Sequence, residues 1–377
     1  MIYLDHAATT PPFKEALDRF TSISSENFGN PSSLHAAGFS ASRELEASRS
    51  NILNLMKVNK THGLLFTSGA TEANALAIKG VAFKYQSRGK KIITTAVEHP
   101  SVLNSFRQLG EAFGFEVVIL PVNQKGQVEP SVLEQAMDKS TILVSIMAVN
   151  NETGSINDLP KLIQVVRKFP KAYFHSDVTQ AIGKLNLPYQ DIDLITFSAH
   201  KFGGLKGNGG LAYRKSIQFL PLLSGGSQEF NFRAGTVDVA GASAMSKALS
   251  LTFADMAKTL ERAKGLSKFA RERLSEIDEV AFNSPEDASP FVLNFSLLAH
   301  KASVIVEAMS EKGYCVSSVS ACSSKGEPVS YVVEAMGYDK ERAGNTMRIS
   351  FGHDTELEDV AKFIIDLKKA LKEVRPR

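Results

Sequence analysis

The sequence predicts an α/β fold made of a large domain with a mostly parallel sheet and a second, smaller α+β domain. Two patterns and the length of the chain support this prediction. The first two-thirds alternate short apolar runs with helical stretches, which is the spacing of strands and crossover helices in a parallel sheet. From about Phe253 the pattern changes to a long charged helix followed by shorter pieces of both kinds, and 377 residues suffice for two domains.

Seven short apolar runs are the candidate strands of the large domain. They span residues 63–67, 91–95, 116–121, 142–149, 172–177, 194–198 and 210–213. Helical patterns at 71–86, 101–113 and 159–168 lie between several of them, and an amphipathic segment covers 356–373. We therefore expect residues 15–250 to form the large domain, and residues 1–14 together with 251–377 to form the small one.

The composition argues against several classes of protein. The 43 Lys and Arg residues nearly balance the 40 Asp and Glu residues, so the chain lacks the basic field of a dedicated nucleic-acid-binding protein. No stretch approaches the roughly 20 apolar residues of a membrane-spanning helix, and the first residues do not resemble a signal peptide. Two cysteines, Cys315 and Cys322, are too few for a secreted disulfide framework. We expect a cytoplasmic protein with no nucleic-acid or membrane partner.

Polar residues follow five of the predicted strands. In open α/β sheets, ligands bind beyond the carboxyl ends of the strands, so these residues are the first candidates for a site. They are TSGATE at 67–72, EH at 98–99, NNETG at 150–154, HSD at 175–177 and SAHK at 198–201. Packing does not require so many polar clusters, and a ligand site is therefore predicted at this edge of the sheet.

The segment SGAT at 68–71 follows a strand and begins a helix. Free N–H groups at a helix start can bind a phosphate, and Gly69 would let the phosphate approach closely. An ordinary helix cap is the alternative interpretation. No GK[ST] sequence follows, so the segment is not a Walker motif.

Lys201 and Asp177 are the candidates for covalent and electrostatic chemistry. Lys201 directly follows the apolar run LITFSA, and a desolvated lysine amine is a Schiff-base nucleophile, although most lysines are solvated surface residues. Asp177 could cap a helix, bind a metal together with His175, or pair with a pyridine nitrogen. No HxxxH or CxxC sequence completes a metal site, so we expect no metal.

The two cysteines have different surroundings. Cys322 lies in SSVSACSSKGEP, which has no apolar period and predicts a mobile loop with a reactive thiolate. Cys315 lies in the apolar segment GYCV, where we expect a buried and inert thiol.

Together these residues resemble the site of a pyridoxal-phosphate enzyme, and the ordered motifs resemble the cysteine desulfurases related to NifS and IscS, which are of the class-V aminotransferase type. The motifs are YLDHAATT, NPSSLHAAG, TSGATEAN, EHPSVL, VNNETG, HSDVTQAIGK, SAHKFGG, FRAGT, SSVSACSS and MRISFG. They run from Tyr3 to Gly352, which is nearly the whole chain. The resemblance implies the fold-type-I pyridoxal-phosphate transferase architecture, with a seven-stranded sheet in the large, cofactor-binding domain and the cysteine loop in the small domain.

The resemblance also implies a role for individual residues. The catalytic residues would be Lys201, which holds the cofactor and removes a proton, Cys322, which accepts sulfur, and His99, which stacks on the cofactor ring. Arg348 would bind the substrate carboxylate, with Asn30 close by. The cofactor-binding set would be Ala70, Thr71, His99, Asn151, Asp177, Gln180, Ser198, His200, Lys201 and, from the partner subunit of a homodimer, Thr236.

The implied reaction converts L-cysteine to L-alanine and leaves a persulfide on Cys322. The sulfur would pass to an acceptor protein in iron–sulfur cluster assembly or in tRNA thiolation. Selenocysteine lysis, transamination and a non-catalytic role in sulfur relay are the alternatives. Val319, Leu205 and Ser227 depart from the family pattern. The chain stops at Arg377 without the tail that binds the cluster scaffold in housekeeping relatives, which leaves the acceptor open.

Overall fold

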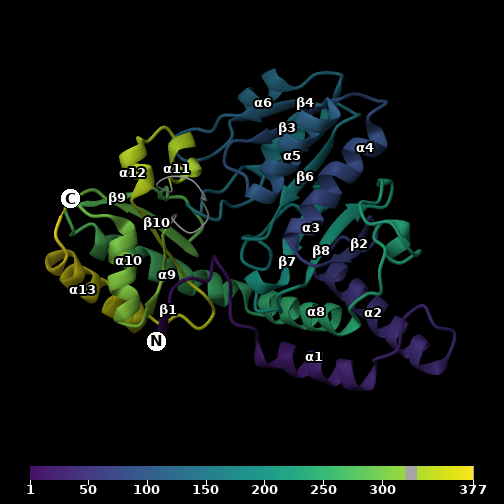
Figure 1. Cartoon of the computed structure of the whole chain (residues 1–377), viewed down its shortest axis with the longest axis horizontal. Helices are drawn as coiled ribbons and strands as arrows, with labels where there is room; N and C mark the ends of the chain where they lie inside the picture. Colours follow the sequence, from purple (N-terminus) through teal and green to yellow (C-terminus); the bar gives the residue numbers. More distant parts are fainter. Residues whose placement is uncertain (319–328, 377) are drawn as a thin grey trace.

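A seven-stranded sheet forms the centre of the larger part of the molecule (Figure 1). The structure is a computed structural model that describes residues 1–318 and 329–376. The strand order is β2-β8-β7-β6-β5-β3-β4; β3 to β7 pair in parallel, while β8 runs antiparallel to both β2 and β7. The strands are β2 (His62–Thr67), β3 (Lys91–Thr95), β4 (Glu116–Leu120), β5 (Thr141–Ser145), β6 (Tyr173–Asp177), β7 (Leu194–Ser198) and β8 (Gly209–Arg214). The predicted mostly parallel sheet is confirmed.

The predicted strand at 142–149 is wrong in its second half. β5 ends at Ser145, and the run that follows stays buried and bonds to β6 at alternate residues only, through the N–H groups of Ile146 and Ala148. Ile146 donates a backbone hydrogen bond to His175, and Val149 forms an isolated bridge with Ile156. An apolar run indicates burial but not the direction of the backbone, so the sequence pattern could not place this end.

Helices cover both faces of the large sheet. One face packs against α2 (Ala36–Leu55), α7 (Leu159–Arg167) and α8 (Val239–Ala254). The other packs against α3 (Ala70–Ala75), η1 (Leu76–Gly80), α4 (Val81–Tyr85) and α5 (Pro100–Phe113). Two further helices, α1 (Lys14–Glu26) and α6 (Pro130–Ala136), and the short turns η2 (Tyr189–Asp191), η3 (Ala199–Lys201) and η4 (Glu229–Asn231) complete this part.

A smaller antiparallel sheet, in the order β12-β13-β10-β9, has its own core. Its strands are β9 (Val280–Phe282), β10 (Val292–Leu297), β12 (Ser317–Ser318) and β13 (Thr346–Ser350). The helices of this part are α9 (Met256–Leu274), α10 (Ala302–Glu311), α11 (Tyr331–Ala335), α12 (Lys340–Gly344) and α13 (Leu357–Glu373).

The first residues of the chain lie with this C-terminal part (Figure 1). β1 (Ile2–Tyr3) pairs with β11 (Tyr314–Cys315), and Asp5 forms a bridge with Ser350. The N-terminal segment then runs from the small sheet to the large one. The domain limits 15–250 and 1–14 plus 251–377 stay a prediction. Within the described part of the chain, no helix combines the length and the apolar character needed to cross a membrane.

Candidate functional site

A cavity of about 450 Å³ lies at the carboxyl ends of the parallel strands. Its wall comes from the residues that follow β2, β3, β5, β6 and β7, from the N-terminal segment at Ala7 and Ala8, and from Arg348 on β13. The structure therefore brings together most of the predicted site residues. Those that line the cavity are Ala70, Thr71, His99, Asn151, Asp177, Gln180, Ser198, His200, Lys201 and Arg348.

Three predicted site residues do not line this cavity. Asn30 is exposed in the connection between α1 and α2, where its Oδ1 accepts a hydrogen bond from the Ser32 N–H at 3.0 Å. Thr236 is exposed before α8. Cys322, and with it the departure at Val319, lies outside the described residues.

The end of the cavity nearest α3 has the features of an anion site. Gly69, with a φ of 150°, precedes the helix, and the first N–H groups of a helix have no partner within it. The Glu72 carboxylate accepts from the Ser68 N–H at 2.7 Å and pairs with Arg233 at 2.8 Å, which holds the turn in place. Burial, together with the charges of two nearby lysines, lowers the pKa of His200 to about 4, so this ring is neutral.

Lys201 lies on the turn η3 directly after β7 and is half-buried. Its Nζ donates hydrogen bonds to the carbonyl oxygens of Ala7 at 2.5 Å and Ala8 at 2.6 Å. Burial is the main reason that its pKa falls to about 7, and the positive charges of Arg348 and Lys184 lower it further. A substantial fraction of this amine is therefore uncharged at neutral pH.

Asp177 ends β6 and is buried at the bottom of the cavity. Its Oδ1 accepts from the Thr179 N–H at 2.9 Å, and its Oδ2 accepts from Asn74 Nδ2 at 2.8 Å. Each carboxylate oxygen keeps acceptor capacity for a further donor.

His99 caps the N-terminus of α5 and is half-buried. Its Nδ1 lies 2.8 Å from Ser101 Oγ and accepts from the Ser101 N–H at 3.2 Å. Burial lowers the pKa of His99, so the ring is neutral near pH 7.

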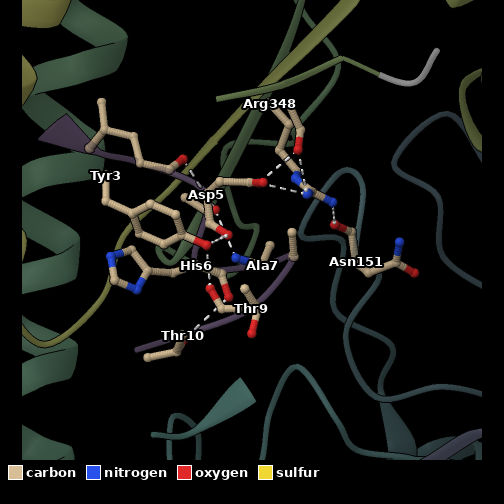
Figure 2. A network of polar contacts seen from close by, with 12 residues as sticks. Tyr3, Asp5, His6, Ala7, Thr9, Thr10, Asn151 and Arg348 are labelled. Carbon is tan, nitrogen blue, oxygen red and sulfur yellow. Dashed lines mark hydrogen bonds and ion pairs between the residues drawn. The ribbon is translucent and has the colours of Figure 1, made fainter. Parts of the chain in front are cut away.

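Arg348 reaches the cavity between Asp5 and Asn151 (Figure 2). Its Nη2 pairs with Asp5 Oδ1 at 2.9 Å and donates to Ser317 Oγ at 3.2 Å, while Nη1 donates to the Asn151 carbonyl at 2.8 Å. Its Nε is buried and has no hydrogen-bond partner among the described residues. Donor capacity of the guanidinium therefore remains for a bound anion.

The sequence prediction missed Asp5 and Ser317, and it named Glu98 only as part of the polar pair that follows a predicted strand. Asp5 and Ser317 hold Arg348, and both lie within motifs that carry the resemblance, which is the signal that could have found them. Glu98 is fully buried beside His99, and burial raises its pKa to about 8.

Cys315 is half-buried on the two-stranded β1–β11 sheet, so the expectation of a buried thiol is wrong. A two-stranded sheet covers its residues less than a central strand does.

The residues present fit a pyridoxal phosphate molecule. Gln180 Oε1 and Asn151 Oδ1 are buried acceptors with no partner among the described residues, although both side chains line the cavity. A buried acceptor without a donor is costly, and a ring hydroxyl can supply the missing donor. The anion site, the Asp177 carboxylate and the Lys201 amine face the same cavity and match the phosphate, the ring nitrogen and the aldehyde of this molecule.

Comparison with known proteins gives a consistent set of relatives. The family model described as aminotransferase class-V matches residues 2–363. A protein named cysteine desulfurase IscS from Dictyoglomus turgidum is 40% identical over 378 residues, which cover 99% of this chain and 95% of the relative. A solved NifS-like protein is 31% identical, with a TM-score of 0.92 over 99% of this chain and 100% of its own. A structure described as SspA in complex with cysteine is 29% identical, with a TM-score of 0.80 over 93% of this chain and 99% of its own.

Proposed function

We propose a function from one established premise: the chain belongs to the aminotransferase class-V family and, within it, to the cysteine desulfurases. We infer that its substrate is L-cysteine, that it releases L-alanine, and that it retains the sulfur as a persulfide on Cys322. The observation that carries this proposal is the shared cavity of Lys201, Asp177 and Arg348, which unites an easily deprotonated amine, a buried carboxylate and a cationic anchor.

We propose that pyridoxal phosphate is the cofactor. When bound, it supplies an electron sink for the charge that develops on the substrate α-carbon. Asp177, held by Asn74 and the Thr179 N–H, would keep the ring nitrogen protonated. Gln180 would form a hydrogen bond with the ring hydroxyl, with Asn151 nearby. The phosphate would be bound by Ala70, Thr71, Ser198, His200 and Thr236 of the partner subunit.

Lys201, His99 and Arg348 would act on the substrate. The Lys201 amine holds the cofactor and then takes the α-proton, which its lowered pKa permits near neutrality. Arg348 binds the carboxylate, with Asn30 as a further contact. His99 stacks on the ring and exchanges a proton with the substrate.

Cys322 would carry out the sulfur transfer. Its thiolate attacks the substrate sulfur, the carbon–sulfur bond breaks with its electron pair left on carbon, and a proton then completes L-alanine. The persulfide passes to an acceptor protein of iron–sulfur cluster assembly or tRNA thiolation. We propose that the enzyme is cytoplasmic and a homodimer; the exposure of Thr236, which does not line the cavity of its own chain, supports a site shared between two subunits.

The products released from L-cysteine test this function. We expect equal amounts of L-alanine and sulfide in the presence of a thiol reductant, and a yellow protein that absorbs visible light. A keto acid in place of L-alanine would indicate transamination, and turnover confined to selenocysteine would indicate a lyase. A colourless protein with no turnover would support the non-catalytic relay.

The two cysteines provide a matched pair of variants. Cys322→Ser is expected to keep the cofactor and to lose sulfide release by several orders of magnitude, because a serine hydroxyl without an adjacent base is a poor nucleophile. Cys315 lies on β11 and does not line the cavity, so Cys315→Ser should keep most of the activity. Near wild-type sulfide release by Cys322→Ser would refute the assignment.

A further inference from the structure

Asn74 connects Asp177 to His99 through hydrogen bonds that pass by way of Ser101. Asn74 lies on α3, and its side chain is fully buried. Its Nδ2 donates one hydrogen to Asp177 Oδ2 at 2.8 Å and the other to Ser101 Oγ at 2.9 Å. Its Oδ1 accepts from Thr196 Oγ1 at 2.5 Å. Both hydrogens of the amide are therefore used. One bonds to Asp177 and the other to Ser101, which in turn bonds to His99.

The orientation of the Asn74 amide follows from its neighbours. Its Nδ2 faces Asp177 Oδ2 and Ser101 Oγ, while its Oδ1 faces the Thr196 hydroxyl; the reversed amide would place its oxygen against the carboxyl oxygen of Asp177. Thr196 then donates to Oδ1 and accepts from His175 Nε2 at 3.0 Å. Burial lowers the pKa of His175 to about 4, so this ring is neutral, and its Nδ1 accepts from Ser145 Oγ at 2.7 Å. Each proton on this side of Asn74 is thereby assigned.

The same reasoning assigns the proton of His99. Because Ser101 Oγ accepts from Asn74, its own hydrogen is available to His99 Nδ1 at 2.8 Å. The Ser101 N–H also donates to this Nδ1, at 3.2 Å. A nitrogen that accepts two hydrogen bonds carries no proton, so the neutral ring has its single proton on Nε2. Among the described residues Nε2 forms no hydrogen bond, and the ring lines the cavity.

We propose that Asn74 and Ser101 are positioning residues that fix His99 as the tautomer with its proton on Nε2, directed to the substrate; this inference rests on the proposed function. In this form the ring starts the reaction as a donor and has no free lone pair at Nε2. It can donate to negative charge on the substrate, whereas a proton removed from the substrate must go to another base. Lys201, in the same cavity, is that base.

The tautomer can be measured without an activity assay. The holoenzyme is labelled with ¹⁵N-histidine, and the signals of His99 are identified by their loss in His99→Gln. The ¹⁵N shifts distinguish a protonated from an unprotonated ring nitrogen. We expect a protonated Nε2 and an unprotonated Nδ1. A proton on Nδ1, alone or together with one on Nε2, would overturn the proposal.

Substitutions at Ser101 test the positioning role. Ser101→Ala removes the hydroxyl donor and leaves only the longer N–H contact, so we expect a mixture of tautomers. A typical net hydrogen-bond contribution corresponds to a loss of about three- to tenfold in kcat for L-cysteine, with KM changed less than about twofold. Ser101→Thr keeps a hydroxyl and should restore both the tautomer and kcat. A wild-type tautomer and kcat in Ser101→Ala would overturn the proposal.

Two further variants complete the design. Ser105→Ala is the matched control, because Ser105 lies on the same helix and its hydroxyl bonds only to the Ser101 carbonyl; we expect wild-type behaviour. Asn74→Ala should give the same tautomer mixture as Ser101→Ala, because the serine hydroxyl loses the donor that orients it. Failure of L-cysteine turnover with the Nε2 tautomer intact would count against the proposed function alone. The Nδ1 tautomer in an active enzyme would count against this inference alone.

Discussion

The Lys201 amine loses its proton more easily than an ordinary lysine because of where the fold places it. Burial removes water from the ammonium group, and Arg348 and Lys184 repel its charge. The carbonyl oxygens of Ala7 and Ala8 accept hydrogen bonds from the amine, and the negative charges of Asp5 and Asp177 offset only part of this lowering of its pKa. The lysine that the sequence analysis selected as a Schiff-base candidate therefore lies in surroundings that suit nucleophilic and basic chemistry.

The pH dependence of cofactor capture follows from this lowered pKa. Only the uncharged amine attacks an aldehyde, so its fraction rises with pH and levels off above the pKa of about 7. We expect apo-protein mixed with pyridoxal phosphate to develop visible absorbance faster as the pH rises through about 7. Lys184→Met removes a repelling charge and should move the midpoint to higher pH. A rate that is constant across this range would contradict the assignment.

Asp5 holds the arginine that we propose to bind the substrate carboxylate. Asp5 Oδ1 accepts from both Arg348 Nη2 and Ser317 Oγ, at 2.9 and 2.8 Å. We expect Asp5→Ala to raise KM for L-cysteine about tenfold, the effect of one charge-assisted hydrogen bond, with a smaller change in kcat. Asp5→Asn keeps an acceptor and should raise KM less. Steady-state kinetics distinguish these outcomes, and a lower kcat at unchanged KM would contradict them.

At the scale of elements, the helix that follows β2 shows how tertiary contacts change a local pattern. The sequence predicts one helix over 71–86, whereas the structure has α3, a π-helical turn and α4 in succession. Gly80 lies where the turn ends, and its carbonyl accepts from the Leu220 N–H at 3.0 Å. The predicted helix is therefore confirmed over nearly its whole length, and only the π-helical turn within it is absent from the sequence pattern.

The segment that contains η4 is joined to α2 by a buried ion pair and to β2 by a hydrogen bond. Arg49 donates to both Glu229 oxygens, at 3.0 and 2.7 Å, and the Glu229 carboxylate also accepts from the Phe66 N–H at 2.6 Å. Both side chains are buried. The three residues Glu229, Phe230 and Asn231 have positive φ values of 44°, 59° and 66°, so this pair holds a turn that the backbone alone disfavours.

Removal of Glu229 should destabilise the protein strongly. Glu229→Ala leaves Arg49 buried without its main partner, and we expect the free energy of unfolding to fall by about 3–5 kcal/mol. The matched control is Glu46→Ala, which removes the other, largely exposed carboxylate that pairs with Arg49 and should cost less than about 1 kcal/mol. Urea unfolding measures both. Equal losses would show that burial of the pair does not determine its contribution.

At the scale of the whole molecule, the cavity of one chain is incomplete if Thr236 and Asn30 belong to the site. Both residues are exposed and lie outside the cavity wall of their own chain. A two-fold dimer can bring an exposed residue of one subunit to the site of the other. This arrangement would make activity a property of the pair of chains.

Mixed dimers test the shared site. Thr236→Ala alone and Lys201→Ala alone should each have low activity at limiting cofactor. In a mixed dimer, the Thr236→Ala chain keeps its Lys201 and receives Thr236 of the partner subunit, so one complete site forms. We expect refolded mixtures to recover activity that neither variant has alone, up to about a quarter of wild type from random pairing. Absence of recovery in a mixture shown to contain mixed dimers would contradict a shared site.

The sequence alone determined the elements and the order of the polar groups along the sheet. Short apolar runs that alternate with helical stretches identified the strands. The residues after them, such as Asp177 and Lys201, were found because the ends of parallel strands meet at one edge. These signals are local in the chain. The family motifs add further residues at these same strand ends, and most of the predicted site residues therefore line one cavity.

Only the tertiary structure decided how those residues are held. Arg348 meets Asp5, which is 343 positions away in the chain, and Asn74 joins Asp177 to Ser101 across three elements. The pKa of Lys201 depends on desolvation and on charges from other segments. Such contacts and electrostatic effects depend on distances in space. A sequence pattern records only which residues are neighbours along the chain, so the contacts can be identified only from the folded structure.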